Sequence, residues 1–300
     1  MKNFRSQDWI REIEKLPVLS ELQRNLKNFS EIDMSKKTQL EIRNAYFNHC
    51  NLFPYVFEDS WTADLMNQLI TFRVRTNVNK EKEDITNPNT YRYPPDDCCK
   101  YNGRANIKGN SVFYGAFDAQ TAVIETKPEK EQIQYFTTWK NNSKSAPFFA
   151  TFLPFNLPMD NLFKEYSIKK YIGIEFMCNQ IGLNKTQELI ELSGTFAKWF
   201  QTGEYPYSIT SWISNTYIVE HKIDFIIYPS VQLESKTFCI AYTKNYINDN
   251  MILDRVIEYK ISGIKNNKSK VNLIQAGSNI NGKIEFSEPN ENDVTLMNLK

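Results

Sequence analysis

The sequence predicts an α+β protein in which an N-terminal helical region precedes a core of mixed strands and helices. Before residue 69, apolar residues repeat at intervals of three and four, which is the period of a helix. After it, short runs rich in β-forming residues alternate with helical segments. We therefore expect a helical accessory domain over residues 1–68, a core domain that carries the functional site over residues 69–249, and a β-hairpin and tail packed on that core over residues 250–300.

Four apolar runs with helical spacing make up the N-terminal region. Pro17 separates the first run from the second, the third begins after Ser35, and Ser60 could cap a fourth helix over residues 61–70. The stripes of the first three runs comprise Trp9, Ile10, Ile13, Leu16, Leu19, Leu22, Leu26, Phe29, Leu40, Ile42, Ala45 and Phe47. These stripes are most simply core, and a partner-binding surface is the alternative.

Residues 71–75 read as a strand with two arginines on one face. Phe72 and Val74 alternate with Arg73 and Arg75, so the two pairs should point to opposite sides of the sheet. Two arginines on one face of a strand can bind an anion such as phosphate through their forked guanidinium groups. The alternative is that they lie on a solvated edge of the sheet and bind nothing. Residues 77–97 follow as a long polar loop, a kind of segment that is often functional or mobile.

The stretch from residue 103 to residue 125 carries three chemically different side chains on three adjacent elements. Arg104 lies in a turn, and Tyr114 lies in a strand expected over residues 111–116. Asp118 can cap a short helix that brings Glu125 to its end. A loop, a strand and a helix that fold back on one another can line one pocket, although ordinary strand–helix units share this pattern.

The rest of the chain continues the alternation of strands and helices. Asn184 can cap a helix up to residue 201, and Pro229-Ser230 ends the most apolar strand of the chain. Strands are expected over residues 133–139, 148–153, 223–228 and 237–242, a second helix over 208–220, and a hairpin over 256–263 and 270–275.

Composition excludes several classes of protein. Hydrophobic residues make up 41% of the chain, enough for a substantial core. The 36 basic and 35 acidic residues leave a net charge of +1, which gives no argument for nucleic-acid binding. The five cysteines are odd in number and lack the spacing of a disulfide framework, so we expect reduced thiols. No signal peptide or membrane-length apolar run is visible, so we expect a soluble, cytoplasmic protein without a membrane partner.

Generic catalytic motifs are absent from the sequence. It contains no GxxxxGK phosphate loop, no GxGxxG dinucleotide motif and no GxSxG nucleophile elbow. The two histidines, His49 and His221, are far apart, and the vicinal Cys98-Cys99 pair has no further ligands nearby, so no metal is expected. His221 follows a predicted helix, where a histidine is favoured by the helix dipole. Any chemistry must therefore rest on Arg, Glu, Tyr and Ser.

The order of these pieces resembles the RES domain family, which is named for Arg, Glu and Ser. That family has an aromatic-Arg-x-Arg strand, a Pro-Pro loop, a Gly-Arg turn, an apolar-Tyr strand, a Thr-Ala-x-x-Glu helix and a late strand ending in Ser. The corresponding segments here are Phe72-Arg73-Val74-Arg75, Pro94-Pro95, Gly103-Arg104-Ala105-Asn106, Phe113-Tyr114, Thr121-Ala122-Val123-Ile124-Glu125 and Asp224-Phe225-Ile226-Ile227-Tyr228-Pro229-Ser230. The chain departs from the family at Phe225, often a glycine, and lacks the Gly-x-Asn that often precedes the final strand.

The resemblance implies a fold similar to ADP-ribosyltransferases and the role of a bacterial toxin. RES proteins are typically toxins of toxin–antitoxin pairs that consume NAD+ by hydrolysis or phosphorolysis, or transfer ADP-ribose to a protein. The usual antitoxin is a helix-turn-helix protein of the Xre type. The expected partners are therefore NAD+ as substrate and such an antitoxin, with a homo-oligomer left open.

The residues suit this chemistry. Arg73, Arg75 and Arg104 can bind the two phosphates of NAD+. Glu125 can stabilise the positive charge that develops on the ribose when the nicotinamide bond breaks. Nicotinamide leaves as a neutral base and requires no general acid.

Three further residues complete the expected site. Tyr114 can stack on nicotinamide. Ser230, expected to be exposed at a strand end, can hydrogen-bond the carboxamide or ribose. Asn106 is expected among the substrate-binding residues. The catalytic set is thus Glu125, Arg73, Tyr114 and Ser230.

Two alternatives share this pocket. A protein-modifying ADP-ribosyltransferase needs the same residues as an NAD+-cleaving enzyme. A catalytically silent binding module is the other alternative, in which the N-terminal helices would recruit a partner.

Overall fold

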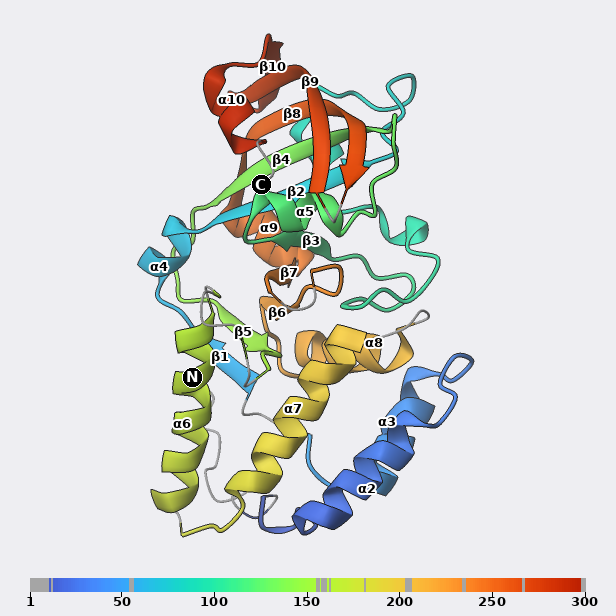
Figure 1. The fold of residues 1–300 in the computed structure, drawn as a ribbon, viewed down its shortest axis with the longest axis vertical. Coiled ribbons are helices and arrows are strands. Elements are labelled where there is room, and N and C mark those ends of the chain that lie inside the picture. The colour runs from blue at the N-terminus through green and yellow to red at the C-terminus, as the bar shows by residue number, and fades with distance from the viewer. Residues whose placement is uncertain are drawn as a thin grey trace.

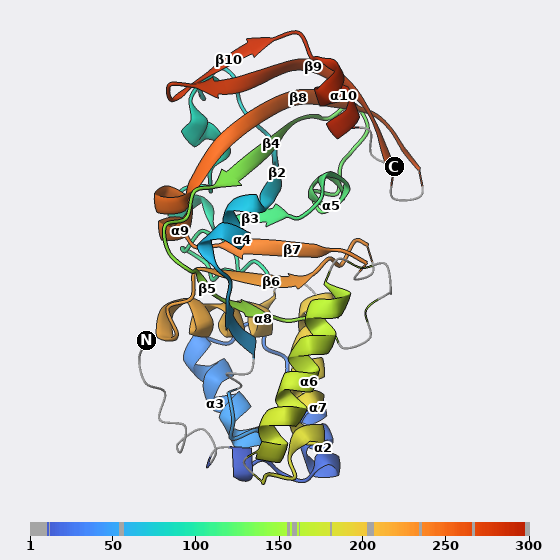
Figure 2. The same cartoon turned by 90° about the vertical axis from the view of Figure 1, so that its left-hand side faces the viewer.

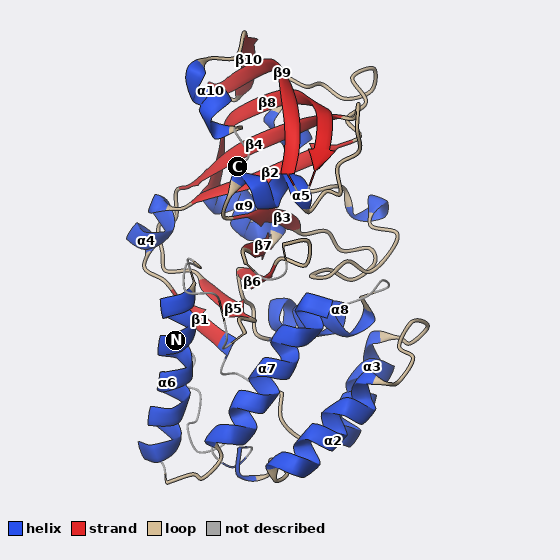
Figure 3. Ribbon diagram, viewed as in Figure 1, coloured by secondary structure: helices blue, strands red, loops and turns tan. Residues whose placement is uncertain are grey.

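The computed structural model confirms the α+β class, with a ten-stranded mixed sheet and helices gathered largely at one end (Figures 1 and 3). It describes residues 11, 13–53, 57–154, 157, 161, 163–180, 182–202, 207–233, 236–265 and 268–297. The predicted helical positions Trp9 and Ile10 lie outside the described residues, as do Asn266 and Asn267 in the expected hairpin turn.

All ten strands belong to one sheet, in the order β1-β5-β6-β7-β3-β2-β4-β8-β9-β10. Among the described pairs only β5 and β6 are parallel, and the other neighbours are antiparallel. The strands are β1 (Glu58–Ser60), β2 (Ile70–Thr76), β3 (Phe113–Ala116), β4 (Ile133–Asn141), β5 (Phe148–Thr151), β6 (Phe225–Pro229), β7 (Phe238–Tyr242), β8 (Met251–Lys265), β9 (Lys268–Ile280) and β10 (Lys283–Ser287). The C-terminal hairpin therefore continues the main sheet through the pairing of β8 with β4.

Helices cap the two ends of this sheet unequally. They are α2 (Leu19–Ser30), α3 (Gln39–His49), α4 (Ala63–Gln68), α5 (Ala119–Ile124), α6 (Lys164–Gln180), α7 (Thr186–Thr202), α8 (Ser208–Asn215), α9 (Lys244–Asn250) and α10 (Glu291–Leu296). Figure 2 shows α2, α3, α6 and α7 at the end opposite β8, β9 and β10. Short helical turns lie at Pro88–Tyr91, Asp96–Cys98 and Thr216–Glu220.

The N-terminal helices share one hydrophobic core with helices from the middle of the chain. Phe29 of α2 packs on Trp199 of α7 at 5.4 Å between ring centroids, and Tyr46 of α3 packs on Trp212 of α8 at 5.1 Å. The same cluster reaches the sheet at Ile226. Burial of these rings is the main favourable term that holds the helical end on the sheet.

Several predicted boundaries are corrected by the structure. Helix α3, expected to begin after Ser35, begins at Gln39 and is capped by Thr38 through a capping box with Glu41. Thr62, not Ser60, caps α4, because Ser60 belongs to the edge strand β1. Helix α6 has no counterpart in the sequence prediction.

The long loop after β2 is fixed to the sheet by ion pairs. Arg75 pairs with Glu83, and Lys80 Nζ lies 2.6 Å from the buried carboxylate of Glu258 on β8.

His221 follows the helical turn Thr216–Glu220, at the kind of position where a helix dipole favours a histidine. Its Nδ1 also contacts a carboxylate oxygen of Glu58 in β1.

Among the described residues, no helix combines the length and apolar character needed to cross a bilayer.

Candidate active site

A cavity of about 350 Å³ opens where β2, β3, α5 and β7 meet the 103–106 loop and the start of α8. This volume is in the range of small-molecule sites. Its walls are formed by Phe72, Arg73, Val74, Gly103, Arg104, Tyr114, Gly115, Ala116, Ala122, Glu125, Thr126, Tyr207, Tyr228 and Cys239. Four residues predicted from the sequence, Arg73, Arg104, Tyr114 and Glu125, thus line one pocket.

Glu125 ends helix α5 and is held by a strand end that lies 105 residues later in the chain. Asp118 caps the start of this helix by accepting from Thr121 N at 2.8 Å. Ser230 Oγ donates to Glu125 Oε1 at 2.5 Å, and Gln232 N donates to the same oxygen at 3.3 Å. These bonds fix one carboxylate oxygen, and no cation forms an ion pair with Glu125 among the described residues.

Ser230 is buried, which corrects the expectation of an exposed strand-end hydroxyl. It follows β6 directly, and its Oγ also accepts from Leu233 N at 3.2 Å. Its hydroxyl is therefore engaged by the protein on both sides. Ser230 orients Glu125 in this structure.

Arg73 approaches the pocket from β2. Its Nη1 donates to the carbonyl of Tyr114 at 2.7 Å, and its guanidinium lies 4.8 Å from the ring centroid of Phe113. Its Nε is buried without a partner among the described residues. Burial lowers the pKa of Arg73 to about 10, and the nearby charge of Arg75 acts in the same direction. A partly buried, positively charged group with an unpartnered nitrogen gains from an incoming anion.

Arg104 is the more enclosed of the two cations, with a relative exposure of 9%. Its Cζ lies over the rings of Tyr207 at 5.2 Å and Tyr228 at 5.7 Å, and its Nε has no partner in the described part of the chain. Burial opposes the charged form, but Tyr228 and Glu125 outweigh it, so the pKa of Arg104 lies above its usual value. Arg104 therefore remains a cation in the pocket.

Tyr114 and Asn106 lock the Gly-Arg turn. The Tyr114 hydroxyl accepts from Ala105 N and donates to Asn106 Oδ1, both at 2.8 Å. A Cβ atom on Gly103 would meet that Asn106 oxygen at 2.2 Å, so only glycine fits there. Burial raises the pKa of Tyr114, which keeps the phenol neutral. Asn106 thus acts through Tyr114 on the shape of the turn and is not among the residues that line the cavity.

Arg75 is the predicted site residue that the structure does not place in the pocket. It points toward the following loop, where it pairs with Glu83 and donates to the carbonyl of Thr90. The alternation of β2 put Arg73 and Arg75 on the same face, but two residues along a strand separate them by about 7 Å. That separation lets the loop carboxylate engage Arg75.

Among the lining residues that the sequence did not predict as part of the site, Tyr207, Tyr228 and Cys239 carry ionisable side chains. Tyr228 was visible only as part of an apolar strand, and Tyr207 precedes a helix that nothing in the sequence linked to the Gly-Arg turn. Burial raises the pKa of the Cys239 thiol, which disfavours a thiolate nucleophile there. Across the described ranges, no three His, Cys, Asp or Glu side chains gather closely enough to hold a metal ion.

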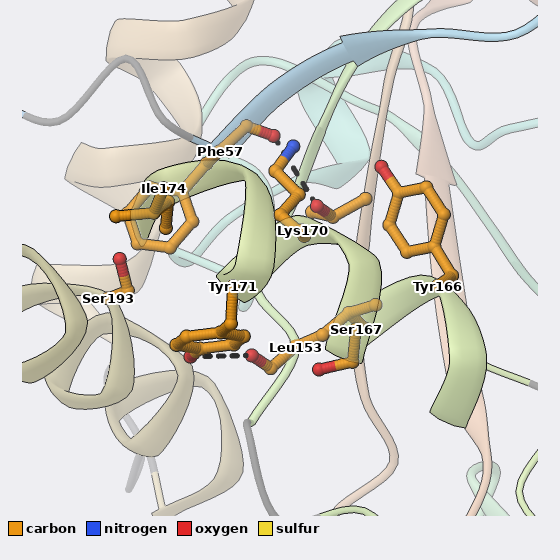
Figure 4. A pocket seen from close by; sticks show the side chains of 9 residues that line it. Phe57, Leu153, Tyr166, Ser167, Lys170, Tyr171, Ile174 and Ser193 are labelled. Carbon is orange, nitrogen blue, oxygen red and sulfur yellow. Dashed lines mark hydrogen bonds between the residues drawn. The ribbon is translucent and has the colours of Figure 1, made fainter. Parts of the chain in front are cut away.

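A second, much smaller cavity lies between α6, α7, the end of β5 and Phe57 (Figure 4). Its volume of about 10 Å³ suits a single water molecule and is far too small for a nucleotide. Lys170 projects beside it, donates to the carbonyl of Glu58 at 3.0 Å and lies 3.6 Å from Asp59. Lys170 therefore ties helix α6 to the edge of the sheet.

We expect the stability contributed by Lys170 to rise with pH above about 8. Burial lowers its pKa in the folded state to about 8 from the ordinary 10.5. Between these values the unfolded state binds more protons than the folded state, so unfolding becomes less favourable as pH increases. Urea unfolding of the native protein and Lys170→Met, at pH 7 to 10.5, checks this. As the pH increases, the free energy of unfolding of the native protein should rise relative to that of Lys170→Met. The difference between the native protein and Lys169→Met, in which an exposed lysine is replaced, should show no such trend.

Comparison with known proteins identifies part of this chain. The family model described as RES domain matches residues 72–250, which include most of β2 and every residue of the pocket. No curated protein matches the chain. Among solved structures, a chain of the M. tuberculosis MbcT-MbcA toxin-antitoxin complex aligns at 9% identity and a TM-score of 0.36, covering 81% of this chain and 92% of that one.

Proposed function

The chain belongs to the RES domain family, and from that premise we propose that it is a toxin that cleaves the nicotinamide–ribose bond of NAD+. One observation carries the proposal. A fixed carboxylate, Glu125, shares a pocket of about 350 Å³ with Arg73 and Arg104, two arginines that no carboxylate neutralises in the described part of the chain. A substrate with phosphates at one end and a developing cation at the other complements this arrangement.

The reaction assigns opposite tasks to these groups. The C–N bond to nicotinamide breaks with its electron pair staying on nicotinamide, which leaves as a neutral base. Positive charge develops on the ribose, as in an oxocarbenium-like transition state, and Glu125 stabilises it. Water or inorganic phosphate then attacks the anomeric carbon and yields ADP-ribose or its phosphate, with a proton released when the attacking group is water.

The two arginines bind the diphosphate in this proposal. Guanidinium groups form forked hydrogen bonds with phosphate oxygens, and partial burial strengthens them. Ser230 positions Glu125, because its hydroxyl is used entirely within the protein. Tyr114 shapes the Gly-Arg turn and presents its ring to the pocket, where it can contact nicotinamide.

Incubation of the purified protein with NAD+, followed by mass spectrometry, tests the proposal. Free nicotinamide with ADP-ribose, or with phosphorylated ADP-ribose when phosphate is present, is the expected result. ADP-ribose retained on a protein would instead indicate a protein-modifying transferase. Intact NAD+ after prolonged incubation would exclude the proposed activity. A helix-turn-helix antitoxin is the partner we propose, and its co-expression should restore growth to cells that produce this chain.

Arg73→Ala should weaken NAD+ binding more than it slows turnover of bound NAD+. The change removes a charged hydrogen-bonding group from the diphosphate, which typically costs about 1.5–3 kcal/mol, or roughly tenfold to a hundredfold in KM. Steady-state kinetics over a wide range of NAD+ concentration separates KM from kcat. Arg75→Ala is the matched control, because Arg75 is engaged by Glu83 outside the pocket. An equal rise in KM for both variants would contradict this assignment.

A further inference from the structure

Tyr207 enters the pocket from the helical part of the molecule. It precedes α8 with φ 53° and ψ 32°, a left-handed conformation that is unfavourable for a residue with a bulky side chain. Its carbonyl accepts from Ser211 N at 2.9 Å and from Thr210 Oγ1 at 3.3 Å, so the first turn of α8 holds it. A tyrosine held in a strained conformation at a pocket wall points to a task for its ring.

The ring of Tyr207 faces Arg104. The Cζ atom of Arg104 lies 5.2 Å from its centroid, within the range of a cation–π interaction. Arg104 has no carboxylate partner among the described residues, so ring faces take the place that an ion pair would fill. An ion pair would compete with an incoming phosphate, whereas an aromatic ring supports the cation without occupying its hydrogen-bonding edge.

Helix α8 holds the backbone of Arg104 as well. Ser214 Oγ donates to the Arg104 carbonyl at 3.4 Å. The same helix rests on the N-terminal region, because Trp212 packs against Tyr46 at 5.1 Å and Phe53 at 5.5 Å. Packing is therefore continuous from the N-terminal helices, through α8, to the cation in the pocket.

We propose that Tyr207 is a positioning residue that holds the Arg104 guanidinium ready for the diphosphate of a dinucleotide substrate. This inference rests on the proposed function for the identity of that substrate. It makes the helical part of the chain a contributor to the binding site. Tyr207 acts through Arg104 and takes no part in bond cleavage.

Inorganic diphosphate, the smallest ligand that carries the recognised group, tests the inference by calorimetry. Tyr207→Asn removes the ring but suits the left-handed backbone, and should raise the Kd for diphosphate about 3- to 30-fold, the worth of one cation–π contact. Tyr207→Phe keeps the ring and should retain native affinity. In an Arg104→Met background, the Asn substitution should have no further effect. Phe47→Asn, which removes a ring from Arg43 on the surface of α3, should leave the Kd native.

Unchanged affinity in Tyr207→Asn, an effect that persists without Arg104, or a native protein that does not bind diphosphate would overturn the inference. Nicotinamide riboside, which lacks the diphosphate, adds a second criterion: equal weakening of its binding by Tyr207→Asn would place the ring on the nucleoside instead. A native protein that binds diphosphate through Tyr207 and Arg104 but leaves NAD+ intact would overturn the proposed function alone. Thermal unfolding of every variant shows that each is folded.

Discussion

Replacing Glu125 by Gln should reduce turnover of NAD+ by about a hundredfold or more, while the affinity for NAD+ stays close to native. The amide keeps the size of the carboxylate, and its oxygen can still accept from Ser230 Oγ and Gln232 N, so the local geometry is preserved. The lost charge matters only when the ribose becomes cationic, which makes this a transition-state interaction. Removal of one such preorganised electrostatic contact typically costs about 3 kcal/mol.

Two measurements separate this effect from binding. Single-turnover kinetics at saturating NAD+ reports the chemical step, and calorimetry on the slowed variant reports the Kd. Glu129→Gln is the matched control, because Glu129 is exposed and follows the same helix. In cells, production of the Glu125→Gln protein should no longer arrest growth. Native turnover by a folded Glu125→Gln protein would remove Glu125 from the mechanism.

The sequence predicted those elements around the pocket that short-range pattern controls. The strand that carries Arg73 and the capped helix that ends at Glu125 are bounded by turn and capping residues, which act over a few positions. The order of motifs that the chain shares with the RES family then added Ser230 to the predicted site residues. The hydrogen bond from Ser230 to Glu125 gives that association a physical basis.

Features that depend on distant contacts could not be predicted. Ser230 follows an apolar strand, and only the tertiary structure shows that a carboxylate far away in sequence buries its hydroxyl. Arg75 shares a strand face with Arg73, but it forms an ion pair with Glu83 in the loop after β2 and therefore does not line the pocket. Helix α6 was not predicted because its apolar residues do not form one stripe: Ile174 is buried, whereas Phe176 is 64% exposed.

The division into domains at residues 68 and 249 stays a prediction, and the packing of the N-terminal helices bears directly on it. Phe29 and Tyr46 are completely buried against Trp199 and Trp212. These tryptophans belong to the segment that the RES model matches. An accessory domain that could be detached would instead present its own core and a thin, polar contact.

We therefore expect a fragment of residues 71–300 to fail to fold. This fragment lacks the N-terminal helices, so Phe196, Trp199 and Trp212 would all be exposed. It also lacks β1, which forms the edge of the sheet. Each large apolar side chain contributes about 1.5–3 kcal/mol when buried, and whole domains are stable by only about 5–15 kcal/mol. Near-UV circular dichroism and urea unfolding should show neither fixed aromatic packing nor a cooperative transition in the fragment.

Point variants in the full chain measure how much this shared core contributes to the free energy of unfolding. Phe29→Ala leaves a cavity in the shared core and should lower the free energy of unfolding by about 3–5 kcal/mol. Leu40→Ala, at a position in α3 that is 65% exposed, should change it by less than about 0.5 kcal/mol. A fragment of residues 71–300 that unfolds cooperatively would show that the part carrying the pocket folds alone. In that case the aromatic contacts across α2, α3, α7 and α8 would join two separate domains, and Tyr207 would need no help from the N-terminal helices to hold Arg104.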